Sequence, residues 1–435
     1  MARSVGLPAL KRAAGVVTRV LPIPQPMLLV GPGASERLGQ AIGAFAHRRI
    51  LIVTDEVIVR LGLMAPMTDA LSKAGAEFDV FDQVTPDAPL PQIEQGIARF
   101  NDGDCDAIVA FGGGSVMDAA KAIGLSAANH RHPRELVGYF KGLHGPAPIY
   151  AVPTTAGTGS EVTVAAVVSD PEHHKKLVIA DTRIVPRMAA LDPCLMTGLP
   201  APITAATGMD ALTHAVEAYI GQWGTDFTDR MALAAVGMIY QYLPLAFDDG
   251  RNLVAREMMA LASTYAGLAF TRANVGNVHA IAHQLGGLYH TPHGLANAIM
   301  LPPVLRFSVV AAQSRLAKLA LRARLGAPGE PESQLAQKFL DSVEAMNRSL
   351  GIPRQLDALR DEHIAELAQS ACWEANTNYP VPRVMSRGDC EAMLREILPD
   401  PTPAKPVRHP KPVARKASRP KVSRPKAPSP KSTRP

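Results

Sequence analysis

Short runs of apolar residues recur through the first half of the chain, and stretches in which apolar positions have helical spacing separate them. Such runs are typical of strands that are buried on both faces of a parallel sheet, and the intervening helices are then the crossover connections. The pattern therefore predicts an α/β domain with a parallel sheet. Its strands are expected at residues 27–30, 50–54, 78–84, 106–111 and 149–152.

The pattern changes once, after Pro200. From there to Leu398, long stretches rich in Ala, Leu and Met show helical spacing, with breaks at Gly and Pro. The second half is therefore predicted to be helical. The expected organisation is a helical N-terminal extension over residues 1–23, an α/β domain over 24–198, an all-helical domain over 199–399 and a disordered tail over 400–435.

The end of the chain differs from the rest in composition. Residues 401–435 hold eleven of the 45 Lys and Arg residues, ten Pro and no Asp or Glu. A segment with so little apolar surface cannot build a core, so we expect it to be disordered. The rest of the chain carries 34 basic and 39 acidic side chains, so the net charge of +6 comes from the tail. The body is not that of a nucleic-acid-binding protein, and weak binding of polyanions is expected of the tail alone.

Two further features concern the compartment. The four cysteines, at positions 105, 194, 372 and 390, show no CxxC spacing, so neither a disulfide framework nor a thiolate zinc site is expected. No uninterrupted apolar run reaches the ~20 residues of a membrane-spanning helix. The basic segment 2–21 fits a transit peptide as well as an ordinary amphipathic helix. We expect a soluble, cytoplasmic protein without a membrane span.

Three segments at strand ends are candidates for a nucleotide site. GGGSVMDAAK (112–121) follows a strand and opens a helix, so its backbone N–H groups can face a phosphate, although a tight turn has the same pattern. PTTAGTGSEVT (153–163) offers Thr and Ser hydroxyls after the next strand. Asp55 ends the second strand, where a carboxylate can accept from ribose hydroxyls and repel a 2′-phosphate, and where it can equally be a helix N-cap.

The helical half holds a concentration of metal-ligand residue types. Asp210 and His214 are four residues apart and so share one face of a helix. Four histidines then follow within fifteen residues, namely His279, His283, His290 and His293. A single pair of this kind is more often part of a core, but four imidazoles and a carboxylate pair in one domain also fit a divalent metal site. The segment 279–283 lacks the Glu of the HExxH zinc-protease motif.

The segments GGGSVMDAAK, PTTAGTGSEVT, GMDALTHAVEAY and HAIAHQLGGLYHTPHGLANAI, in this order and spacing, resemble the iron-containing (group III) alcohol dehydrogenases. The resemblance covers about residues 24–398. It implies a Rossmann-like dinucleotide-binding domain, an all-helical metal-binding domain as in dehydroquinate-synthase-like enzymes, and an active site in the cleft between them. It also implies a homodimer. The basic tail is not part of the resemblance.

The resemblance assigns roles to individual residues. It implies that the metal ligands are Asp210, His214, His279 and His293, and that His283 stands beside the nicotinamide and the substrate. It implies that Gly113, Gly114 and Ser115 hold the pyrophosphate, with Asp118 close by, and that Thr154, Thr155, Thr158 and Lys176 line the cofactor cleft. Asp55 matches the acidic residue that goes with NAD rather than NADP. His290 stands where many relatives have Asn and has no assigned role.

The implied function is that of a metal-dependent, NAD-linked alcohol dehydrogenase or aldehyde reductase. A divalent ion lowers the pKa of a bound alcohol toward the alkoxide, from which hydride passes to NAD⁺, and His283 relays the proton. The family leads us to expect iron(II), while carboxylate and imidazole ligands also suit zinc. The expected substrate is a small alcohol or aldehyde, in a pocket lined by apolar residues such as Phe270.

Other functions stay open from the sequence. A related oxidoreductase that acts on diols or hydroxy acids has the same motifs, although no Arg is evidently placed for a carboxylate. A dehydroquinate-synthase-like or glycerol-phosphate enzyme would need additional basic residues near the metal motifs. The tail makes a dehydrogenase body with a polyanion-binding segment conceivable. A metallohydrolase, which would turn over without nicotinamide, is the most distant alternative.

Overall fold

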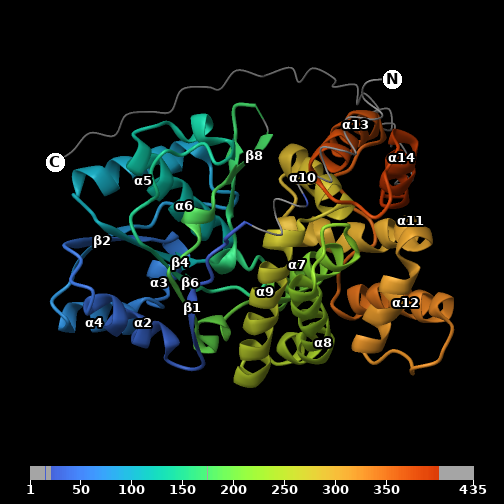
Figure 1. The fold of residues 1–435 in the computed structure, drawn as a ribbon, viewed down its shortest axis with the longest axis horizontal. Coiled ribbons are helices and arrows are strands. Elements are labelled where there is room, and N and C mark those ends of the chain that lie inside the picture. Colours follow the sequence, from blue (N-terminus) through green and yellow to red (C-terminus); the bar gives the residue numbers. More distant parts are fainter. Residues whose placement is uncertain (1–14, 16–20, 174, 401–435) are drawn as a thin grey trace, which may run out of the picture. The chain divides into compact units, whose positions relative to one another are not determined.

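The computed structural model describes residue 15 and residues 21–173 and 175–400. Its first half is built on a parallel six-stranded sheet with the strand order β1-β9-β6-β4-β2-β3 (Figure 1). The five predicted strands are confirmed. The strands are β1 (Met27–Val30), β2 (Arg49–Val53), β3 (Glu77–Phe81), β4 (Ala107–Gly112), β6 (Ile149–Pro153) and β9 (Met188–Leu191). The last of them, β9, was not predicted from the sequence and lies between β1 and β6.

Helices cover both faces of this sheet, as the crossover connections require. They are α2 (Ala34–Gly43), α3 (Glu56–Arg60), α4 (Ala65–Lys73), α5 (Leu90–Asp102) and α6 (Gly114–Asn129). Successive residues of β2 pack on opposite faces of the sheet. Ile50 packs on the side of α2 and α4, and Leu51 packs on the side of α5 and α6. In Figure 1 the first pair of helices lies below the sheet and the second pair above it. Each such residue that is fully buried stabilises the fold by about 1.5–3 kcal/mol.

The strands of a second, smaller sheet lie in the chain between strands of the main one. Its strands are β5 (Gly138–Tyr139), β7 (Ala165–Asp170) and β8 (Lys175–Ala180), in the order β5-β8-β7. The antiparallel pair of β7 and β8 was also missed in the sequence, because its residues are half-buried and carry lysines. β8 reaches the helical half and contacts α10 (Asn277–Tyr289) (Figure 1).

The second half is all-helical in the described residues after β9, as predicted. Besides α10, its helices are α7 (Ala201–Ile220), α8 (Asp226–Asp248), α9 (Leu253–Ala273), α11 (His293–Arg322), α12 (Glu332–Ser349), α13 (Asp361–Asn378) and α14 (Arg387–Glu396). α7 is the central one, since every residue from 208 to 220 is buried and it packs against α8, α9 and α11. A Cβ on Gly208 would lie 2.3 Å from the Leu243 side chain, so only glycine lets α8 approach α7 this closely.

Two of these helices, α8 and α11, are long and apolar enough to cross a membrane by length and composition alone. α8 packs against α7 and α9, and α11 packs against α7 and α12. Most of the apolar window of α11 is buried inside the protein. Core helices of soluble proteins have the same properties, and these two contribute to the main helical core.

The structure describes the two ends of the chain only in part. The predicted extension over 1–23 and the predicted tail over 400–435 lie outside the described residues, except for residues 15, 21–23 and 400. The α/β half ends with β9 at Leu191, and the helical half begins with α7 at Ala201. The described residues up to Pro399 form a single compact unit.

Candidate active site

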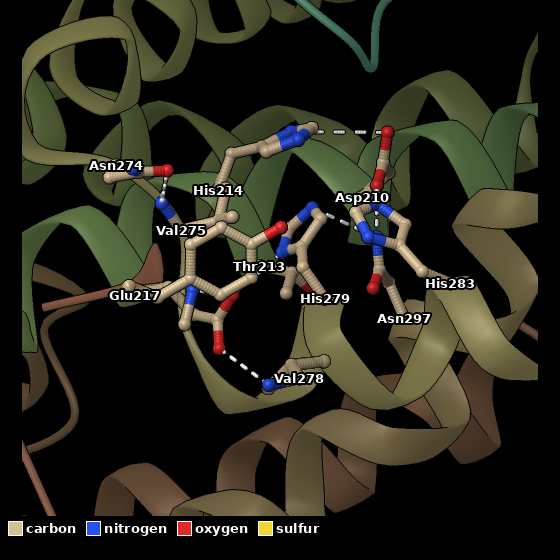
Figure 2. Close-up of polar contacts among 12 residues, drawn as sticks. Asp210, Thr213, His214, Glu217, Asn274, Val275, Val278, His279, His283 and Asn297 are labelled. Carbon is tan, nitrogen blue, oxygen red and sulfur yellow. Dashed lines mark hydrogen bonds and ion pairs between the residues drawn. The ribbon is translucent and has the colours of Figure 1, made fainter. Parts of the chain in front are cut away.

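Four side chains from three helices meet in the helical half. Asp210 and His214 project from α7, His279 from α10, and His293 is the first residue of α11. One ligand atom of each lies within 4.8 Å of the others. Figure 2 shows Asp210, His214 and His279 pointing toward one another from their helices. The structure therefore brings together the four residues that the sequence proposed as metal ligands.

The environment of these side chains keeps the imidazoles neutral. Burial lowers the pKa of His214 and of His279, and it lowers the pKa of His293 to about 4. A neutral imidazole offers one lone pair to a metal ion. The Nδ1 atom of His214 is buried without a hydrogen-bond partner among the described residues, 3.9 Å from Asp210 Oδ2. One carboxylate and three imidazoles are a donor set that suits zinc, iron(II), cobalt or manganese.

Two of the imidazoles are held in place by residues outside the four-residue cluster. His214 hydrogen-bonds the backbone of Gly157, which leaves Nδ1 for the site. His279 Nδ1 lies 2.6 Å from Oε2 of Glu217, a buried residue on α7. Hydrogen bonds of this kind set the tautomer and the orientation of a metal-binding histidine.

Glu217 also fixes the start of α10. Its carboxylate accepts from the backbone N–H of Gly276 at 2.8 Å and from that of Val278 at 2.7 Å. Figure 2 shows the bond to Val278. Burial raises the pKa of Glu217 to about 7. Sequence reasoning missed this residue, although it lies three positions after His214 and so on a neighbouring face of the same helix.

His283 lies beside the four-residue cluster without being part of it. The centre of its ring is 5.5 Å from that of His293 and 6.0 Å from that of His279. Its Nδ1 lies 2.6 Å from Oε1 of Glu374 on α13. Gln284 and Tyr379 donate to the same carboxylate, at 2.8 and 2.6 Å.

Burial acts to raise the pKa of Glu374, but His283 and these hydrogen bonds outweigh it and hold the pKa below its usual value. A charged carboxylate behind Nδ1 leaves Nε2 of His283 as the proton-exchanging atom. Glu374 was also missed in the sequence, because 91 residues separate it from its partner.

Two further candidates have a clear structural position. Phe270 stacks on His214, with ring centres 4.2 Å apart and an angle of 15° between the rings. Its ring therefore lines one side of the four-residue cluster with apolar surface. His290 ends α10 in the left-handed region at φ 54°, and its backbone N–H bonds Gly286. It is not among the residues that the structure gathers at the cluster.

The candidate nucleotide segments lie at one edge of the main sheet. β2, β4 and β6 are neighbouring parallel strands, so Asp55, Gly113 and Thr154 all follow their carboxyl ends. Thr154 is hydrogen-bonded through its N–H to Gly112 O, at 3.0 Å. Asp55 is the N-cap of α3 and accepts from Ile58 N at 3.0 Å, so its capping role is present in the structure.

The glycines at the start of α6 face the 153–163 segment. A Cβ on Gly114 would lie 2.5 Å from Thr158 Cγ2, and one on Gly113 would lie 3.4 Å from Thr155 Oγ1. Gly113 is the N-cap of α6. It has no side chain that could accept a hydrogen bond from the backbone N–H groups in the first turn of this helix. The first backbone N–H groups of a helix without such a partner are available to an anion. The glycine start of α6 and the 153–163 segment therefore lie against each other, with these N–H groups at the junction.

Polar side chains hold these two segments together. Asp118 accepts from Ser160 Oγ at 2.7 Å and from Val167 N at 2.9 Å. Lys121, also on α6, is fully buried and donates to oxygens of Ser160 at 2.6 and 2.9 Å and of Thr163 at 3.1 and 2.9 Å. Burial lowers the pKa of Lys121 to about 8. Sequence reasoning named Asp118 and missed Lys121.

Lys176 and Ser115 both contact Asp87. Lys176, on β8, forms an ion pair with Asp87. Ser115 accepts from the backbone N–H of the same Asp87, at 3.0 Å. A Cβ on Gly286 of α10 would lie 3.9 Å from Lys176 Cε, so this lysine reaches the helical half.

Comparison with known proteins covers most of the chain. Residues 25–193 match the family described as "Iron-containing alcohol dehydrogenase", and residues 204–398 match "Fe-containing alcohol dehydrogenase family, C-terminal". The NAD-dependent methanol dehydrogenase of Bacillus methanolicus is 36% identical over 379 residues, which make up 86% of this chain and 98% of that protein. The 1,3-propanediol dehydrogenase of Klebsiella pneumoniae is 38% identical over 372 residues, 85% of this chain and 96% of that protein.

The similarity extends to three dimensions. The crystal structure of a 1,3-propanediol oxidoreductase matches with a TM-score of 0.83 and 37% identity, over 86% of this chain and 98% of that one. Identity of this size over nearly the full length of several relatives, together with the two family matches, exceeds what a shared fold alone gives. The chain belongs to the iron-containing alcohol dehydrogenase family.

Proposed function

We propose that this protein is a metal-dependent, NAD-linked alcohol dehydrogenase that also reduces aldehydes. The observation that carries the proposal is the double role of the 153–163 segment. On one side its Thr158 packs against the glycine start of α6, and on the other its Gly157 packs against Thr207 of α7, the helix that carries two residues of the proposed metal site. A dinucleotide phosphate and a metal ion bound at these two places would belong to one site.

Asp210, His214, His279 and His293 would hold the divalent ion. When bound, the ion would act as a Lewis acid on a substrate oxygen, and NAD would carry the hydride. The family supports iron(II), while the intrinsic affinity of such ligands supports zinc. Phe270, stacked on His214, keeps one side of the cluster apolar and excludes water from it.

His283 would move the proton between the substrate oxygen and solvent. Its Nδ1 is held by Glu374 at 2.6 Å, and its ring lies beside His293 without joining the ligand cluster. An imidazole in this position can take or give a proton at Nε2 without losing its orientation.

The cofactor would bind along the sheet edge. We assign the pyrophosphate to Gly113, Gly114 and Ser115, and the rest of the cleft to Thr154, Thr155, Thr158 and Lys176, with Asp118 as the residue that holds the two segments together. Asp55 would accept from the ribose hydroxyls with the carboxylate oxygen that does not cap α3, which favours NAD over NADP.

The substrate is proposed to be a small alcohol and its aldehyde. Relatives named for methanol and for 1,3-propanediol match this chain with similar identity. A diol is therefore the second candidate, and the propanediol dehydrogenases support it.

The test is a screen of alcohols, diols and aldehydes with NAD⁺ or NADP⁺ and their reduced forms, on protein loaded separately with iron(II) or zinc. We expect turnover with short alcohols and NAD⁺ only in the metal-loaded protein. Turnover that is independent of both metal and nicotinamide would refute the proposal.

We propose that the chain divides into a dinucleotide-binding domain over 24–198 and a metal-binding domain over 199–399, and that it forms a homodimer. We also propose a cytoplasmic location, which the free cysteines of the described residues support.

For residues 401–435 we propose a polyanion-binding tail that catalysis does not need, because eleven positive charges attract phosphate backbones at low salt. Truncation at Pro401 should leave turnover unchanged and abolish salt-dependent retention on heparin.

A further inference from the structure

Asn297 contacts three of the four proposed metal ligands, although the sequence analysis assigned it no role. It follows His293 by one turn of α11, so both side chains project from one face of that helix. Its side chain is completely buried. The amide Nδ2 lies 2.7 Å from Asp210 Oδ1 and 3.1 Å from Nε2 of both His279 and His293. Figure 2 shows Asn297 next to Asp210 at this point.

These contacts define which way the amide faces. His279 uses Nδ1 toward Glu217, so its Nε2 presents a lone pair, and the carboxylate of Asp210 can only accept. An amide N–H₂ group has two hydrogens to share among the three atoms that it contacts, whereas Oδ1 in the same place would set one more acceptor against them. Oδ1 points the other way and is buried without a hydrogen-bond partner among the described residues. The Asn297 amide therefore donates to the proposed metal ligands, while its own oxygen has no hydrogen-bond partner among the described residues.

We propose that Asn297 is a positioning residue for the metal ligands. Its amide holds the Asp210 carboxylate and the imidazoles of His279 and His293 around one point before an ion binds, and it keeps the carboxylate oriented afterwards. The inference rests on the proposed function, since it requires that these side chains bind a metal ion.

The distances show what changes when an ion binds. Bonds from zinc to imidazole nitrogen or carboxylate oxygen are about 2.0–2.2 Å long, shorter than the contacts that Nδ2 makes here. The ion would therefore take the two imidazole lone pairs, and Asn297 would keep the shortest of its three contacts, the one with Asp210. A hydrogen bond to a ligating carboxylate fixes its orientation, and its loss commonly lowers metal affinity about 10- to 100-fold.

The test compares two substitutions of equal size with a matched control. Asn297→Leu keeps the volume and removes the donor, and Asn297→Asp keeps the shape and replaces the donor by an acceptor. Asn347→Leu is the control, because Asn347 is also buried and donates to the backbone of α11, at Ala298 O and 2.7 Å, away from the cluster. The readouts are the affinity for cobalt(II), from competition with a chromophoric chelator, the visible spectrum of the cobalt(II) protein, and the melting temperature with and without cobalt(II).

We expect Asn297→Leu to lower the cobalt(II) affinity about 10- to 100-fold and to alter the spectrum, because the carboxylate is no longer held. Asn297→Asp should melt earlier than the wild type without metal, since two carboxylates then face each other, and cobalt(II) should raise its melting temperature by more than it raises that of the wild type. Asn347→Leu should lower the melting temperature with little change in affinity or spectrum.

Two results would overturn the inference while the proposed function stands. One is wild-type affinity and spectrum in Asn297→Leu, and the other is an equal loss of affinity in Asn347→Leu. A wild-type protein that binds no divalent ion would instead refute the proposed function, and the inference with it.

Discussion

Nδ1 of His283 lies 2.6 Å from Oε1 of Glu374, and the two residues come from different helices, α10 and α13. Replacing His283 by Ala should lower kcat by about 100-fold or more, as for loss of a general acid or base. Glu374→Gln should lower kcat less and leave the Michaelis constant for NAD⁺ unchanged, because it disturbs only the orientation and charge of His283.

Steady-state kinetics with varied NAD⁺ and alcohol would measure this. Glu362→Gln is the matched control, since Glu362 lies in the first turn of the same α13 with an exposed side chain. Equal losses in both variants would contradict a link between Glu374 and His283.

Removing one metal ligand should remove metal and activity together. We expect His279→Ala and His293→Ala to contain much less than one equivalent of metal after purification, measured by elemental analysis, and to show no turnover. His290→Asn is the control: Asn tolerates the left-handed conformation of this position, and the residue lies outside the cluster. Full metal occupancy in either alanine variant would show that the ion binds elsewhere.

The metal-free protein should lose stability as the pH falls below about 6.5. His214 and His293 have lowered pKa values in the folded protein, so they stay neutral where the histidines of the unfolded chain become protonated. Their contribution is complete above about 6.5 and is lost on acidification toward the folded pKa, which is about 4 for His293. Buried His214 contributes at most about 1.4 kcal/mol for each pH unit in this window.

His279 should add little to this pH dependence. Its partner Glu217 has a pKa raised to about 7 while that of His279 is lowered, so between pH 4.5 and 6.5 the folded pair holds one proton, and the unfolded chain also holds one, on the histidine. The folded and the unfolded protein then bind the same number of protons at these two residues. Melting curves of the metal-free protein from pH 7.5 to 5 would measure the slope, which should be flatter in His293→Ala. A melting temperature that rises on acidification would contradict the assignment.

Asp55 should set the cofactor preference. Asp55→Gly removes the carboxylate that would repel a 2′-phosphate, and it should narrow or reverse the preference for NAD⁺ over NADP⁺ in kcat/KM. The fold should tolerate the change, because Gly at an N-cap costs only a few tenths of a kcal/mol relative to Asp. A wild type that already uses both cofactors equally would contradict the role given to Asp55.

Gly114 should be essential for the cofactor and irrelevant for the metal. Gly114→Ala places a methyl group 2.5 Å from Thr158 Cγ2, so the two segments of the proposed pyrophosphate site must move apart. We expect at least a tenfold loss of NAD⁺ affinity, by fluorescence titration, with unchanged metal content. Adding Thr158→Ser removes the clashing methyl group and should restore part of the affinity. No recovery in the double variant would mean that the backbone of α6, and not this contact, limits binding.

The sequence predicted the strands and the ligands for different physical reasons. β2, β4 and β6 are buried on both faces and so appear as continuous apolar runs. β9 is as buried, but its residues are Met, Ala, Ala and Leu, without a β-branched or aromatic side chain that favours a strand. β7 alternates between buried and partly buried residues, and β8 begins with two lysines, so neither appears as a continuous apolar run. The ligands Asp210 and His214 were visible because one helix turn fixes their separation in the sequence.

The supporting residues could not be found in this way. Glu217 is 62 residues from His279, and Glu374 is 91 from His283, and nothing in the local pattern relates the two members of either pair. Asn297 looked like an ordinary helix residue. A hydrogen bond that orients a ligand depends on how two helices pack, so it becomes visible only when the tertiary structure is known.

The position of β9 has a consequence for synthesis of the protein on the ribosome. β1 pairs only with β9 in the described sheet, and β6 has β9 as one of its two neighbours. The first strand to leave the exit tunnel therefore has no partner until residues 188–191 have been translated. Until then β6 is an open sheet edge, which can pair with another nascent chain. Expression of a fragment that stops before residue 188 should accordingly yield aggregates, while one that ends after Leu191 has a complete sheet.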